Sequence, residues 1–132
     1  MIKYRGVDVQ DGVLLTGYYQ VVENNKDGRL MHCIATPFVE PEEVHPESLA
    51  IADTNIKDQN GNVIFASFQY EVGKMSKGGD IVEWNGERNI NLHCHFYNGA
   101  FYLDHFSQIN EEYRIIKVIG NAYLNRDLLH EN

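Results

Sequence analysis

The chain has 132 residues, enough for one domain or for two small subdomains that share a core. Lys and Arg together number 11 against 19 Asp and Glu, so the formal charge is -8, spread evenly over both halves. This balance disfavours a non-specific binder of nucleic acid or anionic membranes, because such binders use Lys and Arg to displace counterions from phosphates.

No signal for secretion or membrane insertion stands in the sequence. Lys3 and Arg5 interrupt the apolar residues after Met1, and no apolar run approaches the ~18 residues that a membrane span needs. Cys33 and Cys94 lie far apart, each in a strand-like apolar pattern. We therefore expect a cytosolic protein with two buried, reduced thiols.

The first 36 residues predict three strands, at 2–7, 13–23 and 29–36, separated by turns rich in Asp, Asn and Gly. The second strand is rich in β-branched and aromatic residues and contains Gly17. A glycine inside a strand indicates a bend or a close approach of another backbone, and we expect one of these at Gly17.

Residues 37–46 hold all three prolines and several glutamates, which predicts an extended acidic connector with room for a helical turn at 41–45. Asn60-Gly61 then predicts a hairpin within residues 55–65. Residues 66–77 follow as one more strand. Its alternation places Phe68, Tyr70 and Val72 on one side.

A second half, from residue 78, predicts an antiparallel meander around the turns Asn85-Gly86 and Asn98-Gly99. Two-residue turns would pair Trp84 with Glu87 and Ile81 with Ile90 at the first. At the second they would pair Phe96 with Phe101, His95 with Tyr102 and His93 with Asp104. The faces follow from these pairings. The core face would carry Ile81, Ile90, Leu92, Cys94, Phe96, Phe101 and Leu103, and the opposite face His93, His95, Tyr102 and Asp104.

The chain is expected to end with a strand at 113–119 and a helical turn for which Asn125 is the N-cap. These elements predict an all-β fold. We expect an N-terminal β portion over 1–77 and a C-terminal portion over 78–132, the latter curled into a small SH3-like barrel.

Four motifs in order resemble the YopX family of phage and prophage proteins over most of the chain. They are Lys3-Tyr4-Arg5-Gly6 with Gly17-Tyr18-Tyr19, the turn Lys57-Asp58-Gln59-Asn60-Gly61, the motif Gly79-Asp80-Ile81-Val82, and the ending Val118-Ile119-Gly120-Asn121 followed by Leu128-Leu129. One departure is that about a dozen residues, near 66–77, separate the Asn-Gly hairpin from Gly79, whereas the two are almost adjacent in the usual pattern. The resemblance implies a mostly β fold encoded by a phage or prophage, with no established activity and no catalytic residues to carry over. We expect such a protein to act in the host cytoplasm.

Candidate chemistry centres on the second Asn-Gly hairpin. His93 and His95 share a face that Asp104 can reach across the strand pair, which is compatible with a metal site. A fourth ligand is missing, however, and Cys94 alternates to the other face, so a polar ladder across the strands is the favoured interpretation. Trp84, beside a turn, is a second candidate for binding, together with Tyr102.

We therefore expect a small non-enzymatic binding or accessory module without cofactor or metal, with an unidentified protein partner and with a homo-oligomer left open. A nucleic-acid-associated protein is the first alternative and would need a local basic patch. A metal-dependent enzyme is the second, and it would need further ligands around His93, His95 and Asp104.

Overall fold

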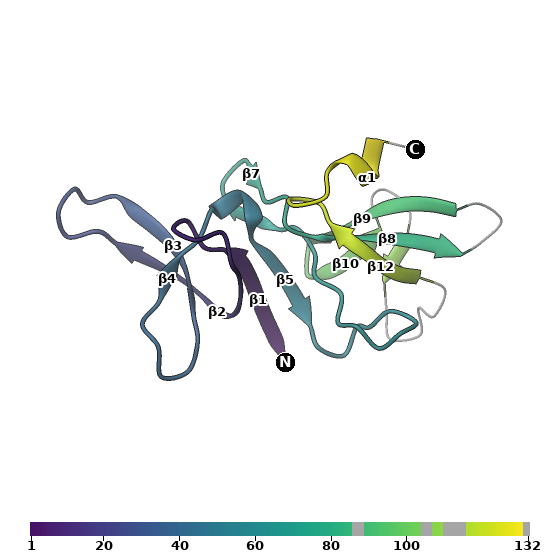
Figure 1. Cartoon of the computed structure of the whole chain (residues 1–132), viewed down its shortest axis with the longest axis horizontal. Helices are drawn as coiled ribbons and strands as arrows, with labels where there is room; N and C mark the ends of the chain where they lie inside the picture. The colour runs from purple at the N-terminus through teal and green to yellow at the C-terminus, as the bar shows by residue number, and fades with distance from the viewer. Residues whose placement is uncertain (86–88, 104–106, 110–115, 131–132) are drawn as a thin grey trace.

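The computed structural model describes residues 1–85, 89–103, 107–109 and 116–130, with backbone alone at 84–85, 89–91, 107–109 and 130 (Figure 1). Two five-stranded antiparallel sheets and one small hairpin account for most of it. The all-β fold expected from the sequence is confirmed. No helix in the described part of the chain is long and apolar enough to cross a bilayer.

The first sheet has the strand order β4-β3-β2-β1-β5. Its strands are β1 (Ile2–Val7), β2 (Leu14–Glu23), β3 (Leu30–Ala35), β4 (Glu42–Glu43) and β5 (Ala50–Asp53). The three strands expected from the first 36 residues are thus present. In the acidic connector, the short strand β4 and the 3-10 turn η1 (Pro46–Ser48) replace the helical turn expected at 41–45.

Strand β2 changes partners at Gly17. Its residues up to Gly17 pair with β1, and its residues from Tyr18 onward pair with β3. A Cβ at Gly17 would collide with the carbonyl oxygen of Ala35, so only glycine lets the two backbones come this close. The expected close approach is confirmed, and beyond it the β2–β3 hairpin projects away from the second sheet (Figure 1).

The second sheet has the order β11-β10-β9-β8-β12. Its strands are β8 (Asp80–Asn85), β9 (Asn89–Tyr97), β10 (Ala100–Leu103), β11 (Ser107–Ile109) and β12 (Ile116–Asn121). Over the described residues this sheet is open, with β11 and β12 at its edges. The SH3-like barrel is therefore not confirmed.

The turn at Asn98-Gly99 sets the register that the sequence predicts. Asn98 and Gly99 have φ values of 49° and 81°, as a two-residue primed turn requires. The pairs Phe96–Phe101 and His95–Tyr102 follow from it and are confirmed. The expected pair of His93 with Asp104 lies outside the described residues.

The register predicted at Asn85-Gly86 is wrong. Asn85 pairs with Asn89, which leaves three residues between the strands instead of two, and Ile81 faces His93 rather than Ile90. An odd shift exchanges the two faces of a strand. Val82 accordingly lies in the main core with Leu92, whereas Ile81 is buried on the histidine face. Because β8 offers an apolar residue to either face, its pattern could not decide between the registers.

A short segment around Ala66 and Ser67 joins the two sheets. Ala66 exchanges two backbone hydrogen bonds with Ile51, at 2.8 and 2.7 Å. Ser67 donates its amide to the Cys94 carbonyl at 2.9 Å and accepts from the Phe96 amide at 2.7 Å. The first sheet is thereby connected to β9 of the second through hydrogen bonds between backbone groups.

The strand expected over residues 66–77 is in fact a hairpin, formed by β6 (Gln69–Glu71) and β7 (Lys74–Met75). Phe68 is buried and Tyr70 packs against the core. Val72 lies in the turn and is 95% exposed, so it does not share their side as expected. Gly73, at φ 76°, reverses the chain one residue after Val72.

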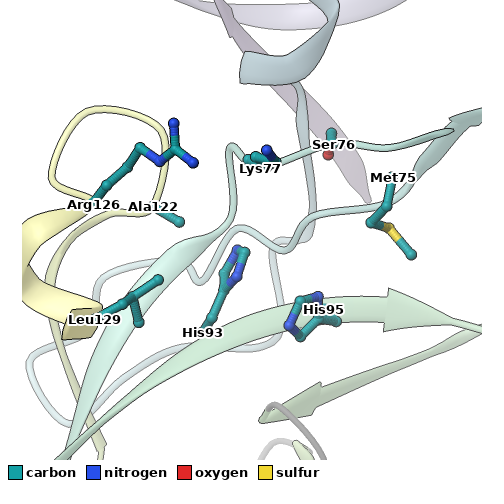
Figure 2. A pocket seen from close by; sticks show the side chains of 8 residues that line it. All are labelled: Met75, Ser76, Lys77, His93, His95, Ala122, Arg126 and Leu129. Atoms are coloured by element: carbon teal, nitrogen blue, oxygen red, sulfur yellow. The ribbon is translucent and has the colours of Figure 1, made fainter. Parts of the chain in front are cut away.

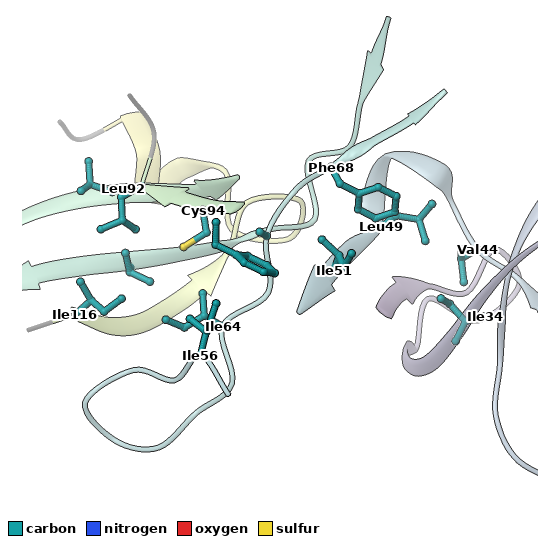
Figure 3. Close-up of a cluster of buried hydrophobic side chains, with 14 residues drawn as sticks. Ile34, Val44, Leu49, Ile51, Ile56, Ile64, Phe68, Leu92, Cys94 and Ile116 are labelled. Carbon is teal, nitrogen blue, oxygen red and sulfur yellow. The ribbon is translucent and has the colours of Figure 1, made fainter. Parts of the chain in front are cut away.

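One hydrophobic cluster of 14 buried residues runs through both sheets (Figure 3). Ile34, Val44 and Leu49 lie at its N-terminal end, and Leu92 and Ile116 lie in the second sheet. Cys33 and Cys94 are both buried and form no disulfide, as expected. The core contains residues from both sides of the boundary at 77–78. The division into an N-terminal portion over 1–77 and a C-terminal portion over 78–132 stays a prediction.

The C-terminal helical turn α1 (Asp127–His130) is present, and the Asn125 carbonyl accepts the Leu128 amide at 3.1 Å. Asn125 as the N-cap stays a prediction. The Asn125 side chain accepts a hydrogen bond from the Asn121 amide at 3.0 Å, and the Asn125 backbone amide donates to the Asn121 carbonyl at 2.7 Å. Asn125 thus closes the turn between β12 and α1, and Leu128 packs over Gly120, where a Cβ would force the Leu128 side chain to shift.

Candidate functional site: a basic pocket

A pocket of about 350 Å³ opens between the β6–β7 hairpin, strand β9 and the C-terminal segment (Figure 2). Its lining comes from three stretches that are far apart in the sequence, and consists of Met75, Ser76, Lys77, His93, His95, Ala122, Arg126 and Leu129. A concave site of this kind is the first place to look for ligand binding.

Strand β9 presents its two histidines to this pocket. His93 and His95 are two residues apart, so the strand repeat places both on one face. Their ring centroids are 4.3 Å apart at an interplanar angle of 51°. In Figure 2 the His93 ring points from β9 toward Lys77. The predicted common face of His93 and His95 is thus confirmed, and both side chains are half-buried.

Ser67 is a hydrogen-bond partner of His93. Its hydroxyl oxygen lies 2.8 Å from His93 Nε2 and accepts the Gly79 amide at 2.9 Å. Ser67 Oγ and His93 Nε2 thus share a hydrogen bond, and the tautomer of the imidazole decides which of the two donates. Ser67 is fully buried, so it positions His93 and is not itself presented to a ligand.

Lys77 and Arg126 supply two permanent positive charges. Both side chains are exposed, and neither forms an ion pair with any residue that the structure describes. The Lys77 amide donates to the Glu47 carbonyl at 2.6 Å, which fixes this part of the chain. Among the residues that the structure describes, no acidic side chain lines the pocket, although the protein carries a charge of -8. The pocket is therefore a local basic site on an acidic protein.

A network of polar and aromatic side chains supports the hairpin that bears Met75. His32, buried in β3, lies 2.6 Å from the Tyr19 hydroxyl and 3.1 Å from Glu71 Oε1. Burial raises the pKa of Tyr19 to about 12, and the hydrogen bonds from Lys74 and His32 lower the pKa of Glu71. Tyr19 also packs against Phe68 and Tyr4. The β6–β7 hairpin is thereby attached to the first sheet.

A second hollow, of about 290 Å³, is acidic. It is lined by Asp8, Val9, Gln10, Asp11, Pro41, Glu42 and Glu43. Asp8 and Glu42 share a hydrogen bond, which lowers the pKa of Asp8 and raises that of Glu42. Within the described part of the chain, no group of three His, Cys, Asp or Glu could hold a metal ion.

The structure places some of the predicted binding residues at this pocket and does not describe others. His93 and His95 line the pocket, and Tyr102 is half-buried and pairs with His95. The Trp84 side chain and all of Asp104 lie outside the described residues. Sequence reasoning missed Lys77 and Arg126, for which no local motif gives a signal, since only the folded chain brings them to the histidines.

Comparisons with known proteins add no relative to this description. No family model matches the chain, and no similar protein was found among curated proteins or solved structures. The likeness to the YopX family accordingly remains a resemblance in four motifs.

Proposed function

We propose that the chain is a small non-enzymatic binding or accessory module. It takes a small ligand, or one group of a protein partner, in the basic pocket. The observation that carries this proposal is the pocket itself, a concave site assembled from the hairpin, β9 and the C-terminal segment.

The side chains around the pocket support binding over catalysis. Two hydroxyls lie beside it, that of Ser67 against His93 and that of Ser76 in the pocket lining, and both residues are buried. Each accepts a backbone amide, from Gly79 at 2.9 Å and from Phe68 at 2.9 Å respectively. They are engaged in holding the backbone, and what faces the opening is charge, imidazole and apolar surface.

Filling the pocket tests this proposal. Met75→Trp places an indole at its edge, and Val72→Trp, on the exposed turn of the same hairpin, is the matched control. We expect at least one member of a graded set of small aromatic alcohols, amines, carboxylates and phosphates to shift the amide NMR signals of Lys77 and Ala122. The shifts should be kept in V72W and lost in M75W. Shifts that persist in M75W, or none in the parent protein, would contradict the proposal.

The nucleic-acid alternative depends on a local basic patch, and the pocket is such a patch on a small scale. Its two permanent cations would neutralise about two phosphates, which predicts a slope of log K against log salt no steeper than about -2. We expect duplex binding no tighter than about millimolar at physiological salt, weaker than common non-specific binding. Fluorescence anisotropy of a labelled duplex measures both. Micromolar binding with a steep slope would favour the alternative.

A further inference from the structure

We infer that the occupant of the basic pocket is an organic anion, a carboxylate or phosphate carried on a small apolar body. This inference rests on the proposed function and adds the chemical class of the ligand. It draws on three properties of the pocket, namely its charge, its apolar lining and the way in which its cations are held.

The charge of the pocket is opposite to that of the whole protein. Lys77 and Arg126 are two of only 11 Lys and Arg residues, yet both line this one site, and the described part of its lining holds no carboxylate. A guanidinium offers two parallel N–H groups that match the oxygens of a carboxylate or phosphate, and an ammonium adds a point charge. The same two charges oppose the binding of a metal cation beside His93 and His95.

The remaining lining gives the ligand an apolar part. Met75, Ala122 and Leu129 contribute apolar surface on two sides of the histidines (Figure 2). A volume of about 350 Å³ lies near the lower end of the range for small-molecule sites. The pocket therefore suits one ring or a short chain next to the charged group, and it is larger than a bare inorganic anion needs.

Both cations are attached to backbone that is already ordered. Lys77 follows the buried Ser76, and the Lys77 backbone amide donates a hydrogen bond to the Glu47 carbonyl. Arg126 follows the closed turn between Asn121 and Asn125. Preorganised backbone reduces the entropy that a ligand must offset, because only the side-chain ends remain to be ordered.

The test compares four probes with one ring and different charge: phenyl phosphate, phenylacetate, benzyl alcohol and benzylamine. We expect the two anions to shift the Lys77 and Ala122 amides saturably, with benzyl alcohol and benzylamine at least about tenfold weaker, as loss of a charge-assisted contact implies. Two further probes separate the sources of the anion. A short peptide that ends in Phe with a free carboxylate, and its amide, show whether a chain terminus binds as the free acids do.

A second part of the test removes the two positively charged side chains of the pocket. Lys77→Met with Arg126→Met should weaken phenyl phosphate by about tenfold or more. Lys3→Met with Lys26→Met changes the net charge equally at exposed positions outside the pocket lining, and should leave binding within about twofold, as expected if only local charge matters. Circular dichroism and urea unfolding show that each variant is folded.

The outcomes separate this inference from the proposed function. Equal or tighter binding of benzyl alcohol or benzylamine in the pocket, lost in M75W, overturns the anion inference and leaves the binding module standing. Anion binding that survives the removal of Lys77 and Arg126 overturns the inference as well. If no probe of either set shifts Lys77 or Ala122, both proposals fail.

Discussion

Replacing Arg5 with Met tests whether one buried ion pair holds the two sheets together. Arg5, in β1, donates to Asp80 Oδ1 at 2.6 Å and to the Gly78 carbonyl at 2.9 Å. Asp80, at the start of β8, accepts the Phe65 amide with its other oxygen at 2.8 Å. The two side chains are 10% and 3% exposed, so water does not replace a lost partner.

The expected cost follows from that burial. Removing one partner of a buried pair costs about 3–5 kcal/mol, because the other charge stays buried without compensation. This is a large share of the ~5–15 kcal/mol that stabilises a typical domain. For a chain of this length it corresponds to a fall in Tm of roughly 10–20 °C.

The loss should also depend on pH. Burial raises the pKa of Asp80, and the Arg5 guanidinium opposes that rise. Without Arg5 the pKa of Asp80 in the folded state rises further, while in the unfolded chain it returns to its ordinary value. Between these two values the folded state binds more protons, so the stability of the variant falls as pH rises through the folded-state pKa. The deficit should therefore be smaller at pH 5 than at pH 8.

Urea unfolding followed by circular dichroism, at pH 5 and pH 8, measures both effects. Arg29→Met is the matched control, because Arg29 pairs with Glu43 at 2.8 Å but is 53% exposed, and exposed pairs contribute little. The reasoning is refuted if R5M and R29M lose equal stability. It is also refuted if the R5M deficit is the same at both pH values.

Three further predictions concern the contact of Gly78 with the Ser48 carbonyl, the turn that begins at Asp58, and the two cysteine thiols. Gly78→Ala should cost ~3 kcal/mol or more in urea unfolding, because its Cβ would collide with the Ser48 carbonyl. Asp58→Ala should cost about 2–4 kcal/mol, because the buried carboxylate accepts amides of its own turn and that of Val118 at 2.9 Å. Cys33, whose thiol pKa is raised by burial, should not react with Ellman's reagent at pH 8 until the protein unfolds.

Each of these three predictions has a control at another position of the same chain. Gly61→Ala, in open space at φ 82°, should cost only about 1–2 kcal/mol from backbone strain, so an equal cost at Gly78 would contradict the collision. Asp11→Ala removes one exposed turn contact and should cost less than D58A. Cys94 should be as protected as Cys33, and rapid labelling of either thiol in the folded protein would contradict the buried positions.

The sequence by itself determined the all-β class, most strand positions and the register at Asn98-Gly99. These depend on local chemistry, since strand alternation and a turn that requires positive φ act over a few residues. The same local rule placed His93 and His95 on one face, and so identified one wall of the pocket. It also singled out Gly17 as a close approach of two strands.

Only the tertiary structure decided the rest. At Asn85-Gly86 both Ile81 and Val82 could be buried, so the pattern did not set the register, and an odd shift exchanged the faces. In the sequence Asp80 stands within the motif Gly79-Asp80-Ile81-Val82, and its partner Arg5 is 75 residues away. Lys77 and Arg126 likewise lie far from His93 and His95 in the sequence, and only the folded chain brings them into one pocket. Hydrogen bonds of the Ala66–Ser67 segment and the turn at Asn121 bring distant stretches together, and no local period encodes contacts of that range.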